Sequence, residues 1–307
     1  MPPTLGRRLR VAFPAAELKS TVKIHEILRQ GTTYSFEFFP PKDDEMEMVL
    51  ARTLRNLAPL APSFVSVTYG AGGTTRERTH ELVVSIDHDT QMTPMAHLTC
   101  AGHTRAELVE IVGRYRQAGI ENILALGGDP PEALGLGHGE LPHAIDLVEL
   151  VRAEGDFSIG VAAFPEPHPQ AESLAADRER TAEKLALADF AITQFFFDAH
   201  HYFDLVDSLR ALGVDKPVIP GIMPATSIAS IARMTKLQGS EFPPWLEAKL
   251  RAVEDDPKAV RAVGIDEATK LSRELLDAGA PGLHFITMNR SNATREIYQA
   301  LGLTRAK

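Results

Sequence analysis

The sequence predicts a (β/α)₈ barrel, and two observations carry this prediction. Eight short runs rich in β-branched and aromatic residues recur along the 307 residues, and segments with helical spacing of apolar residues separate most of them. Strands that alternate with helices form a parallel sheet, and eight such units close a barrel of roughly 250 residues. The expected strands are 34–39, 64–69, 95–100, 122–127, 158–164, 190–197, 218–223 and 283–288.

The segments between these strands are expected to form an outer layer of helices. Their apolar residues recur at intervals of three and four, as packing on a sheet requires. Gly119 and Gly213 end two of the segments, where a glycine is typical of a helix C-terminal cap. Two helical patterns fall between the seventh and eighth strands, so extra helices are expected there. The segments are 45–58, 104–119, 144–155, 201–213, 239–256 and 265–280.

A doubly wound sheet is the main alternative fold. That fold normally carries a glycine-rich phosphate-binding turn after its first strand, whereas here the first strand is followed by Pro40, Pro41 and Lys42. No Gly/Ser-rich linker or low-complexity segment divides the chain. We therefore expect a single catalytic domain over 1–307, in which residues 1–20 form an N-terminal arm.

Composition excludes several classes of protein. The chain is 44% hydrophobic and 24% charged, which predicts a sizeable core, and its net charge of -9 argues against a nucleic-acid partner. Cys100 is the one cysteine, so no intramolecular disulfide can form and a reducing compartment is expected. No apolar run is long enough to span a membrane. These features predict a cytoplasmic protein without membrane contact, and they leave open whether it forms a homo-oligomer.

The first predicted strand carries an acid among aromatic residues. In Tyr-Ser-Phe-Glu-Phe-Phe (34–39), alternation places Phe36 and Phe38 on one face and Glu37 on the other. The prolines that follow put Glu37 near the carboxyl end of the strand. A buried carboxylate there needs a partner, must be neutralised, or is used in chemistry.

Polar side chains also fall at the carboxyl ends of several other strands, where barrel enzymes carry their chemistry. Taken singly, a strand Ser, Thr or His is more often structural than functional, but their convergence at one end indicates a site. A metal site is not expected, because the eleven histidines show no HExxH spacing and adjacent His200 and His201 should point in different directions. The positions are Ser66, Thr68, His97, Thr99, Asp129, His168, Gln194, Asp198 and Arg290.

Eight motifs on successive strands carry a resemblance to a known family. SFEFFPPK, FVSVTYGAGGTTRERT, HLTC, LGGDPP, VAAFPEPHPQA, AITQFFFD, PGIMP and HFITMNR occur in this order along nearly the whole chain. They resemble the catalytic barrel of the methylenetetrahydrofolate reductase family, of the minimal bacterial type without the regulatory region of eukaryotic members. The resemblance implies reduction of 5,10-methylenetetrahydrofolate to 5-methyltetrahydrofolate by NADH or NADPH, in one-carbon metabolism and methionine biosynthesis.

The same resemblance implies roles for four residues. Glu37 would be the general acid for opening the imidazolidine ring at N10, which leaves an iminium ion at N5, and such an acid is expected to have a raised pKa. Asp129 would stabilise the cationic intermediate and bind the pterin, and Gln194 would orient the pterin. Arg290 resembles an arginine on the substrate side.

Members of the family usually bind FAD, and here the chain departs from their pattern. The usual arginine is Gly127, and two usual tyrosines are His143 and Phe164. Loss of the arginine alone removes a contact of roughly 1.5–3 kcal/mol, about one to two decades in affinity. The expected flavin contacts are Thr68, His97, Leu126, Gly128, His143, Ala144, Phe164, His168, Asp177 and Lys184.

The prediction is therefore weak or absent FAD, with hydride passing directly from the nicotinamide to the iminium carbon. Two alternatives stay open: an FAD-dependent ping-pong reductase of the same substrate, and a folate-binding barrel without catalysis. The choice among NADH, NADPH and a deazaflavin donor also stays open.

Overall fold

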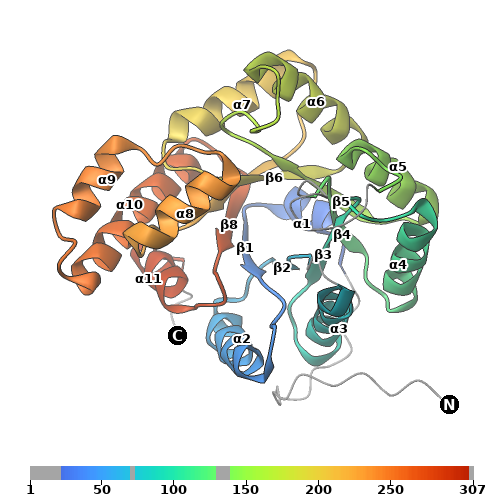
Figure 1. The fold of residues 1–307 in the computed structure, drawn as a ribbon, viewed down its shortest axis with the longest axis horizontal. Helices are drawn as coiled ribbons and strands as arrows, with labels where there is room; N and C mark the ends of the chain where they lie inside the picture. Colours follow the sequence, from blue (N-terminus) through green and yellow to red (C-terminus); the bar gives the residue numbers. More distant parts are fainter. Residues whose placement is uncertain (1–21, 70–72, 129–138, 304–307) are drawn as a thin grey trace.

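Eight parallel strands close into a barrel in the computed structural model, which describes residues 22–69, 73–128 and 139–303 (Figure 1). Each strand pairs with its neighbour in the chain, and β1 pairs with β8, so the predicted fold class is confirmed. The predicted strands are confirmed too, with ends that differ by at most two residues. The strands are β1 (Thr33–Phe38), β2 (Phe64–Val67), β3 (Pro94–Thr99), β4 (Asn122–Leu126), β5 (Ser158–Ala163), β6 (Phe190–Phe195), β7 (Val218–Ile222) and β8 (Gly282–Ile286).

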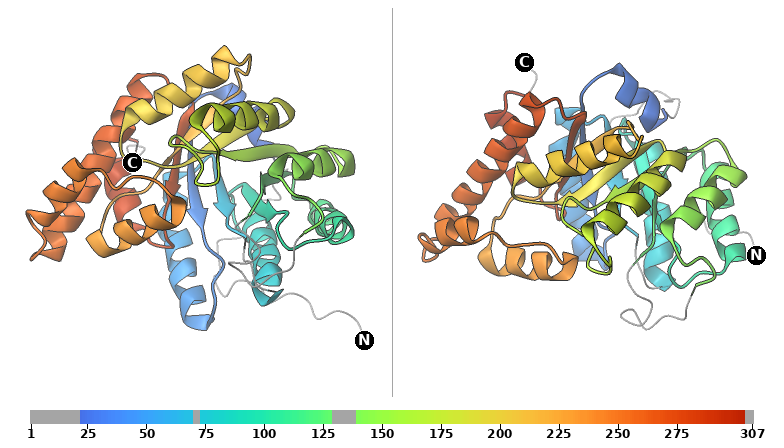
Figure 2. Two further views of the ribbon diagram at one scale, coloured as in Figure 1. Left: turned by 45° about the horizontal axis from the view of Figure 1, so that its top comes forward. Right: turned by 90° about the horizontal axis from the view of Figure 1, so that it is seen from above.

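Helices surround the barrel, and the extra ones expected between β7 and β8 are present. Figure 2 shows α9 and α10 outermost on one side of the molecule. Gly119 and Gly213 follow α4 and α7 with φ of 78° and 82°, the left-handed conformation that suits a glycine after a helix. The helices are α1 (Ile24–Gln30), α2 (Asp44–Leu57), the 3₁₀ turn η1 (Ala58–Leu60), α3 (Gly73–Asp89), α4 (Arg105–Gln117), α5 (Ala144–Glu154), α6 (Leu174–Leu187), α7 (Ala199–Ala211), α8 (Ile228–Gln238), α9 (Pro244–Arg251), α10 (Pro257–Asp277) and α11 (Asn292–Ala300).

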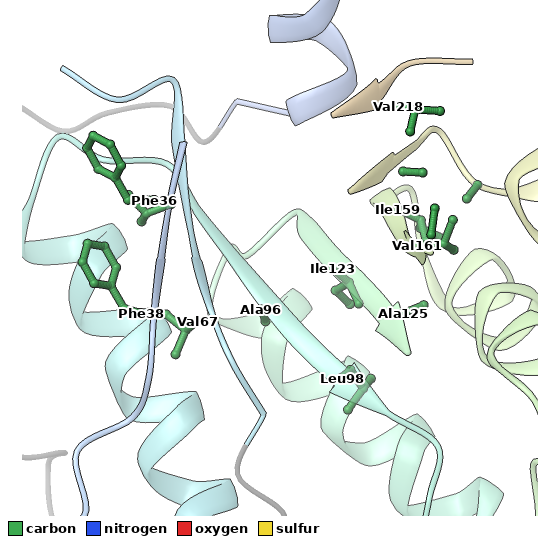
Figure 3. Packing of buried hydrophobic residues seen from close by; sticks show 14 of the residues in the cluster. Phe36, Phe38, Val67, Ala96, Leu98, Ile123, Ala125, Ile159, Val161 and Val218 are labelled. Atoms are coloured by element: carbon green, nitrogen blue, oxygen red, sulfur yellow. The ribbon is translucent and has the colours of Figure 1, made fainter. Parts of the chain in front are cut away.

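The main core lies between the barrel and its helices. Phe36 and Phe38 point to the same side of β1, as strand alternation requires (Figure 3). Both rings are fully buried, and Phe36 lies 5.4 Å from the ring of Tyr298 on α11. With these aromatic rings outside the barrel, the intervening Glu37 faces its interior.

The barrel interior is apolar at its amino end and polar at its carboxyl end. Phe64, Met95, Leu124 and Phe190 belong to one buried apolar cluster, to which Ile24 of α1 also belongs. A hydrogen bond of 2.8 Å from the amide of Ile24 to Asn122 Oδ1 holds α1 against this end. The polar residues Ser35, Glu37, Ser66, His97 and His284 stand on β1, β2, β3 and β8 further toward the carboxyl end.

Two sequence expectations concern the chain as a whole. Residues 1–20, expected to be an arm, lie outside the described residues, so the division of the chain stays a prediction. In the described part of the chain, none of the helices combines the length and the apolar composition that crossing a bilayer requires.

Candidate active site

Glu37 lies at the centre of a buried group of polar side chains. Its Oε2 is 3.4 Å from Nε2 of His284 on β8 and 3.6 Å from Nε2 of His97 on β3. The Glu37 side chain is 13% exposed, whereas both histidines are buried. The acid therefore has two imidazole neighbours inside the barrel and an opening toward its mouth.

His284 is the residue that sequence reasoning missed. Its Nδ1 lies 2.7 Å from Ser35 Oγ, and its Nε2 lies 3.4 Å from both Ser66 Oγ and Glu37 Oε2. The ring stacks on Phe64 with centroids 6.1 Å apart and planes at 16°. Alternation along 283–288 could have placed this histidine inside the barrel, but its contact with Glu37 depends on how the first and last strands pair.

The electrostatics of the group differ from the expectation. Burial raises the pKa of the Glu37 carboxyl, but the hydrogen bond with His284 and the charges of His97 and His284 outweigh it, so the pKa is lowered. The raised pKa expected for this acid is therefore wrong. Burial also lowers the pKa of His97 to about 4, although the neighbouring Glu37 opposes this shift, so His97 is neutral at neutral pH.

The backbone around Glu37 is held by the segment that follows β8. Thr287 Oγ1 donates a 2.6 Å hydrogen bond to the carbonyl of Glu37. The Asn289 side chain accepts from the amide of Phe39 and donates to its carbonyl, both at 2.9 Å. Met288 and Asn289 have φ of 51° and 55°, an unfavourable conformation for side-chain-bearing residues that commonly marks functional segments. The seam between β1 and β8 thus fixes the end of the strand that carries the acid.

Gln194 stands near the carboxyl end of β6, at an irregularity of the sheet. The pairing of β6 with β7 shifts register between Ile192 and Phe195, which re-aims the residues between them. The shift accompanies a close approach of β7, because a Cβ at Gly221 would lie 2.3 Å from the Thr193 carbonyl oxygen. Thr193 Oγ1 accepts a 2.9 Å hydrogen bond from the Gly221 amide. The backbone of β6 next to Gln194 therefore lies in close contact with a glycine of the neighbouring strand.

The other two candidate substrate residues have less structural support. Asp129 lies outside the described residues. Arg290 is exposed beyond β8, and its amide donates to the Thr287 carbonyl at 2.9 Å. Their roles, like those of Glu37 and Gln194, stay predictions.

The expected flavin positions follow strands at the same end of the barrel. Thr68 follows β2, and its amide donates to the Phe38 carbonyl at 2.9 Å. His97 belongs to the Glu37 group described above. The remaining positions lie on β4 and its loop, the start of α5, the loop after β5, and α6; they are Leu126, Gly128, His143, Ala144, Phe164, His168, Asp177 and Lys184.

Two neighbouring glycines after β4 differ in the space around them. A Cβ at Gly128 would lie 2.7 Å from the Ala101 Cβ, and φ there is 89°, so this position requires glycine. A Cβ at Gly127 would meet nothing closer than the Ala144 amide nitrogen at 4.0 Å. The surroundings of Gly127 therefore do not require glycine, in contrast to those of Gly128.

His168, Asp177 and Lys184 face one another on α6 and the loop that precedes it. Burial lowers the pKa of Lys184 to about 8, an effect that the charge of Asp177 opposes. His168 packs edge-on against the Phe164 ring, with centroids 4.6 Å apart.

Gly127, Phe164 and the exposed His143 offer neither the cation nor the two phenol hydroxyls of the usual flavin pattern. These three positions therefore do not match the usual flavin pattern.

One group in the described residues could hold a metal ion. The ligand atoms of Glu166, His201 and Glu241 lie within 4.8 Å of one another, and they come from three separate segments that sequence spacing cannot connect. The rings of His200 and His201 lie 3.9 Å apart, so the expectation that they point in different directions is wrong. Even so, His200 contacts Asp198 whereas His201 contacts Glu166.

A closed parallel barrel with polar groups at the carboxyl ends of its strands defines the class of (β/α)₈ enzymes. The family model for methylenetetrahydrofolate reductase matches residues 23–302, and the chain belongs to this family. It is 38% identical to the 5,10-methylenetetrahydrofolate reductase of Pectobacterium carotovorum subsp. carotovorum over 88% of this chain and 90% of that protein. The Escherichia coli (strain K12) enzyme of that name is also 38% identical, with the same coverage.

Two more distant similarities were found. Methylenetetrahydrofolate reductase (NADH) 1 of Arabidopsis thaliana is 33% identical over 93% of this chain, which covers 51% of the plant protein. A solved Clostridium thermocellum protein, described as binding two copies of 5-methyl-5,6,7,8-tetrahydrofolic acid, has a TM-score of 0.64 at 15% identity. It covers 92% of this chain and 98% of its own, and at this identity the likeness shows the fold alone.

Proposed function

We propose that the protein reduces 5,10-methylenetetrahydrofolate to 5-methyltetrahydrofolate with NADH or NADPH as hydride donor. The observation that carries this proposal is the Glu37 carboxyl, held between His97 and His284 at the carboxyl end of the barrel in a chain of this family. A folate-binding barrel without catalysis would not need an acid with two imidazole neighbours. We place the reaction in the cytoplasm, with no nucleic-acid or membrane partner.

Glu37 delivers the proton that the reaction consumes. Protonation of N10 breaks its bond to the methylene carbon and leaves an iminium ion at N5. Hydride from the nicotinamide then reduces the iminium carbon to the methyl group. The overall change takes up one proton and one hydride, and general acid catalysis of this kind contributes about 10²–10⁴-fold.

Gln194, Asp129 and Arg290 bind the folate. The Gln194 amide both donates and accepts, which suits the pterin ring, and Gln194 stands near the carboxyl end of β6. Asp129 contributes a negative charge that favours the cationic iminium ion. Arg290, exposed at the rim beyond β8, contacts the substrate's outer part.

Hydride passes directly from the nicotinamide to the iminium carbon. The support for this route is the set Gly127, His143 and Phe164, which lacks the charged and phenolic groups of the flavin pattern. Thr68, His97, Asp177 and Lys184 remain at positions expected to contact a cofactor, and they are available to the nicotinamide nucleotide.

Oxidation of NADH and of NADPH by purified protein, dependent on 5,10-methylenetetrahydrofolate, tests the proposal with and without added FAD. We expect 5-methyltetrahydrofolate as product, no stimulation by FAD, and intersecting initial-rate patterns, because both substrates must be bound together. Parallel patterns would indicate a ping-pong route through flavin. Stoichiometric flavin in protein purified without added FAD, seen by its visible absorbance, would overturn the direct transfer. Absence of folate-dependent oxidation with either nucleotide would overturn the reductase assignment.

A further inference from the structure

Three side chains outside the Glu37 group converge beyond the carboxyl ends of β5, β6 and β7. Glu166 lies in the loop after β5, His201 in the first turn of α7, and Glu241 in the segment between α8 and α9. Their ligand atoms, two carboxylate oxygens and one imidazole nitrogen, lie within 4.8 Å of one another. Three successive β/α units thus bring together a mixed set of oxygen and nitrogen donors, which a chance group of surface acids would not provide.

The negative charges of this group are not balanced by a basic side chain of the usual kind. In the part of the chain that the structure describes, neither Glu166 nor Glu241 forms an ion pair with a lysine or an arginine. The titratable groups that act on Glu166 are His201, Glu241 and the neighbouring His200. Two carboxylates that face each other repel, and a divalent cation between them removes that repulsion.

The backbone next to Glu166 is held by a buried arginine. Arg178 of α6 donates hydrogen bonds to the carbonyls of Phe164 and Pro165, at 2.7 and 2.6 Å. These two residues come directly before Glu166, so the guanidinium fixes the backbone from which this carboxylate extends. The amide of Glu241 donates to Glu166 Oε1 at 3.1 Å, which joins the two acidic segments directly.

The segment that carries Glu241 is held as well. Gly239 ends α8 with φ of 77°, and its amide donates to the Thr235 carbonyl at 2.8 Å. A Cβ at Gly239 would lie 2.3 Å from Pro169 Cγ, so this segment packs closely on the loop after β5. Both carboxylates therefore extend from backbone that contacts within the protein keep in place, as a metal site requires.

We propose that Glu166, His201 and Glu241 form a binding site for a divalent transition-metal ion such as Zn²⁺. Zn²⁺ binds imidazole nitrogen and carboxylate oxygen at about 2.0–2.2 Å, and three protein ligands leave a fourth position for water. Two such bonds at a tetrahedral angle separate their ligand atoms by about 3.5 Å. His201 Nε2 and Glu166 Oε1 are already 3.8 Å apart. Mg²⁺ is disfavoured, because it prefers oxygen ligands throughout.

The ion joins three segments of the barrel rim. It connects the loop after β5 to α7 and to the segment after α8, and this loop also carries Phe164 and His168, two of the expected cofactor positions. Because the ion binds the folded chain, it stabilises the fold in proportion to its free concentration and affinity. The site shares no residue with the proposed folate site, so the inference does not depend on the proposed function.

Calorimetric titration of chelator-treated protein with ZnCl₂ tests the proposal. We expect one ion per chain, a Tm that rises with the ZnCl₂ concentration, and no comparable binding of MgCl₂. His201→Gln and Glu241→Gln should each weaken Zn²⁺ binding by at least about tenfold, since even residues that only orient a ligand contribute about 10–100-fold. Trp245, the one tryptophan, lies four positions after Glu241, so its emission provides a second measure of binding.

His200→Gln is the matched control. The rings of His200 and His201 lie 3.9 Å apart, but His200 Nδ1 contacts Asp198 at 2.8 Å, so this variant should bind Zn²⁺ as wild type does. Glu241 is exposed, and its carboxylate forms no hydrogen bond with another described residue, so Glu241→Gln should fold normally. If His201→Gln does not fold, Glu241→Gln therefore decides.

Two results would overturn the proposal. The first is wild-type protein that binds no Zn²⁺. The second is binding that Glu241→Gln and His201→Gln leave unchanged, or that His200→Gln weakens equally, because both indicate adventitious binding by surface histidines. None of these results depends on reductase activity, so they leave the proposed function untouched.

Discussion

The two sides of the barrel mouth are built differently. At the seam of β1 and β8, part-buried hydrogen bonds join Glu37 to His284 and Phe39 to Asn289. On the opposite rim, after β4 and β5, Gly127 leaves open space and His143 is exposed. The seam holds Glu37, the proposed acid, through contacts within the protein itself. Among the described rim residues at the expected cofactor positions, Lys184 and Asp177 carry charged side chains.

This contrast indicates that the residues around Glu37 and the residues at the expected cofactor positions can vary separately. Glu37 and its partners are held by the pairing of the first and last strands, which every barrel of this kind must form to close. The rim residues stand on loops and helix starts, where a substitution disturbs little packing. A substitution on one side should therefore leave the other side unchanged.

The largest effect is expected from Glu37→Gln. Loss of the acid should reduce kcat by at least about 10²–10⁴-fold in the folate-dependent NAD(P)H assay. Affinity for 5-methyltetrahydrofolate and the circular dichroism spectrum should stay close to wild type, because the amide keeps the shape of the carboxylate. Turnover near the wild-type rate would show that another group supplies the proton.

Acid should destabilise the seam side through His97. Burial lowers its pKa from the ordinary value of 6.5 to about 4 in the folded chain, so the unfolded chain binds the proton first as pH falls. The stability contributed by neutral His97 is complete above pH 6.5 and is lost toward pH 4, by about 3 kcal/mol. Urea unfolding between pH 6.5 and pH 4 should show that the unfolding free energy of His97→Gln falls less steeply than that of wild type. His88→Gln, at an exposed histidine, is the control and should show the same pH dependence of the unfolding free energy as wild type.

Gly127→Arg should bring the rim toward the flavin-binding pattern. A Cβ at Gly127 would come no closer than 4.0 Å to the Ala144 amide nitrogen, and a charge-assisted contact from the arginine would increase FAD affinity by about one to two decades. Fluorescence titration of FAD measures the change. Gly127→Met, of similar length but uncharged, is the control, and an equal gain with methionine would contradict the electrostatic explanation.

The smallest effect is expected from Gly221→Ala, which crowds the irregularity of β6. The new Cβ would lie 2.3 Å from the Thr193 carbonyl, and crowding of this kind costs about 1–3 kcal/mol in unfolding free energy. Because Gln194 lies within the irregularity, KM for the folate should also rise. Gly113→Ala, in α4 with nothing within 4 Å, should not destabilise the protein. Equal behaviour of the two variants would show that the register shift does not need Gly221.

The fold could be predicted because the strands and helices have different periods along the sequence. Phe36 and Phe38 alternate with Glu37, whereas α5 and α7 repeat their apolar residues every three or four positions. The strand ends were less predictable, since residues such as Phe196 and Phe197 have strand propensity but lie beyond the last ladder pairs of β6.

The site was predictable only in part, because its polar contacts cross the barrel. Alternation and the prolines located Glu37, but the lowering of its pKa depends on His284, which lies 247 positions away in the sequence. Asn289 was noted only within a motif; its two-way contact with Phe39 is visible only once β1 and β8 pair. The Glu166, His201 and Glu241 group escaped prediction for the same reason.

The seam between β1 and β8 also has a consequence for synthesis of the protein. The acid emerges from the ribosome early, while its imidazole partner and the Asn289 side chain that hold its strand emerge near the end. A chain halted before β8 exposes Glu37 without its partner, and the contact between them is among the longest in sequence separation that the fold must form. Acquisition of activity during synthesis would thus report the moment when the last strand joins the first.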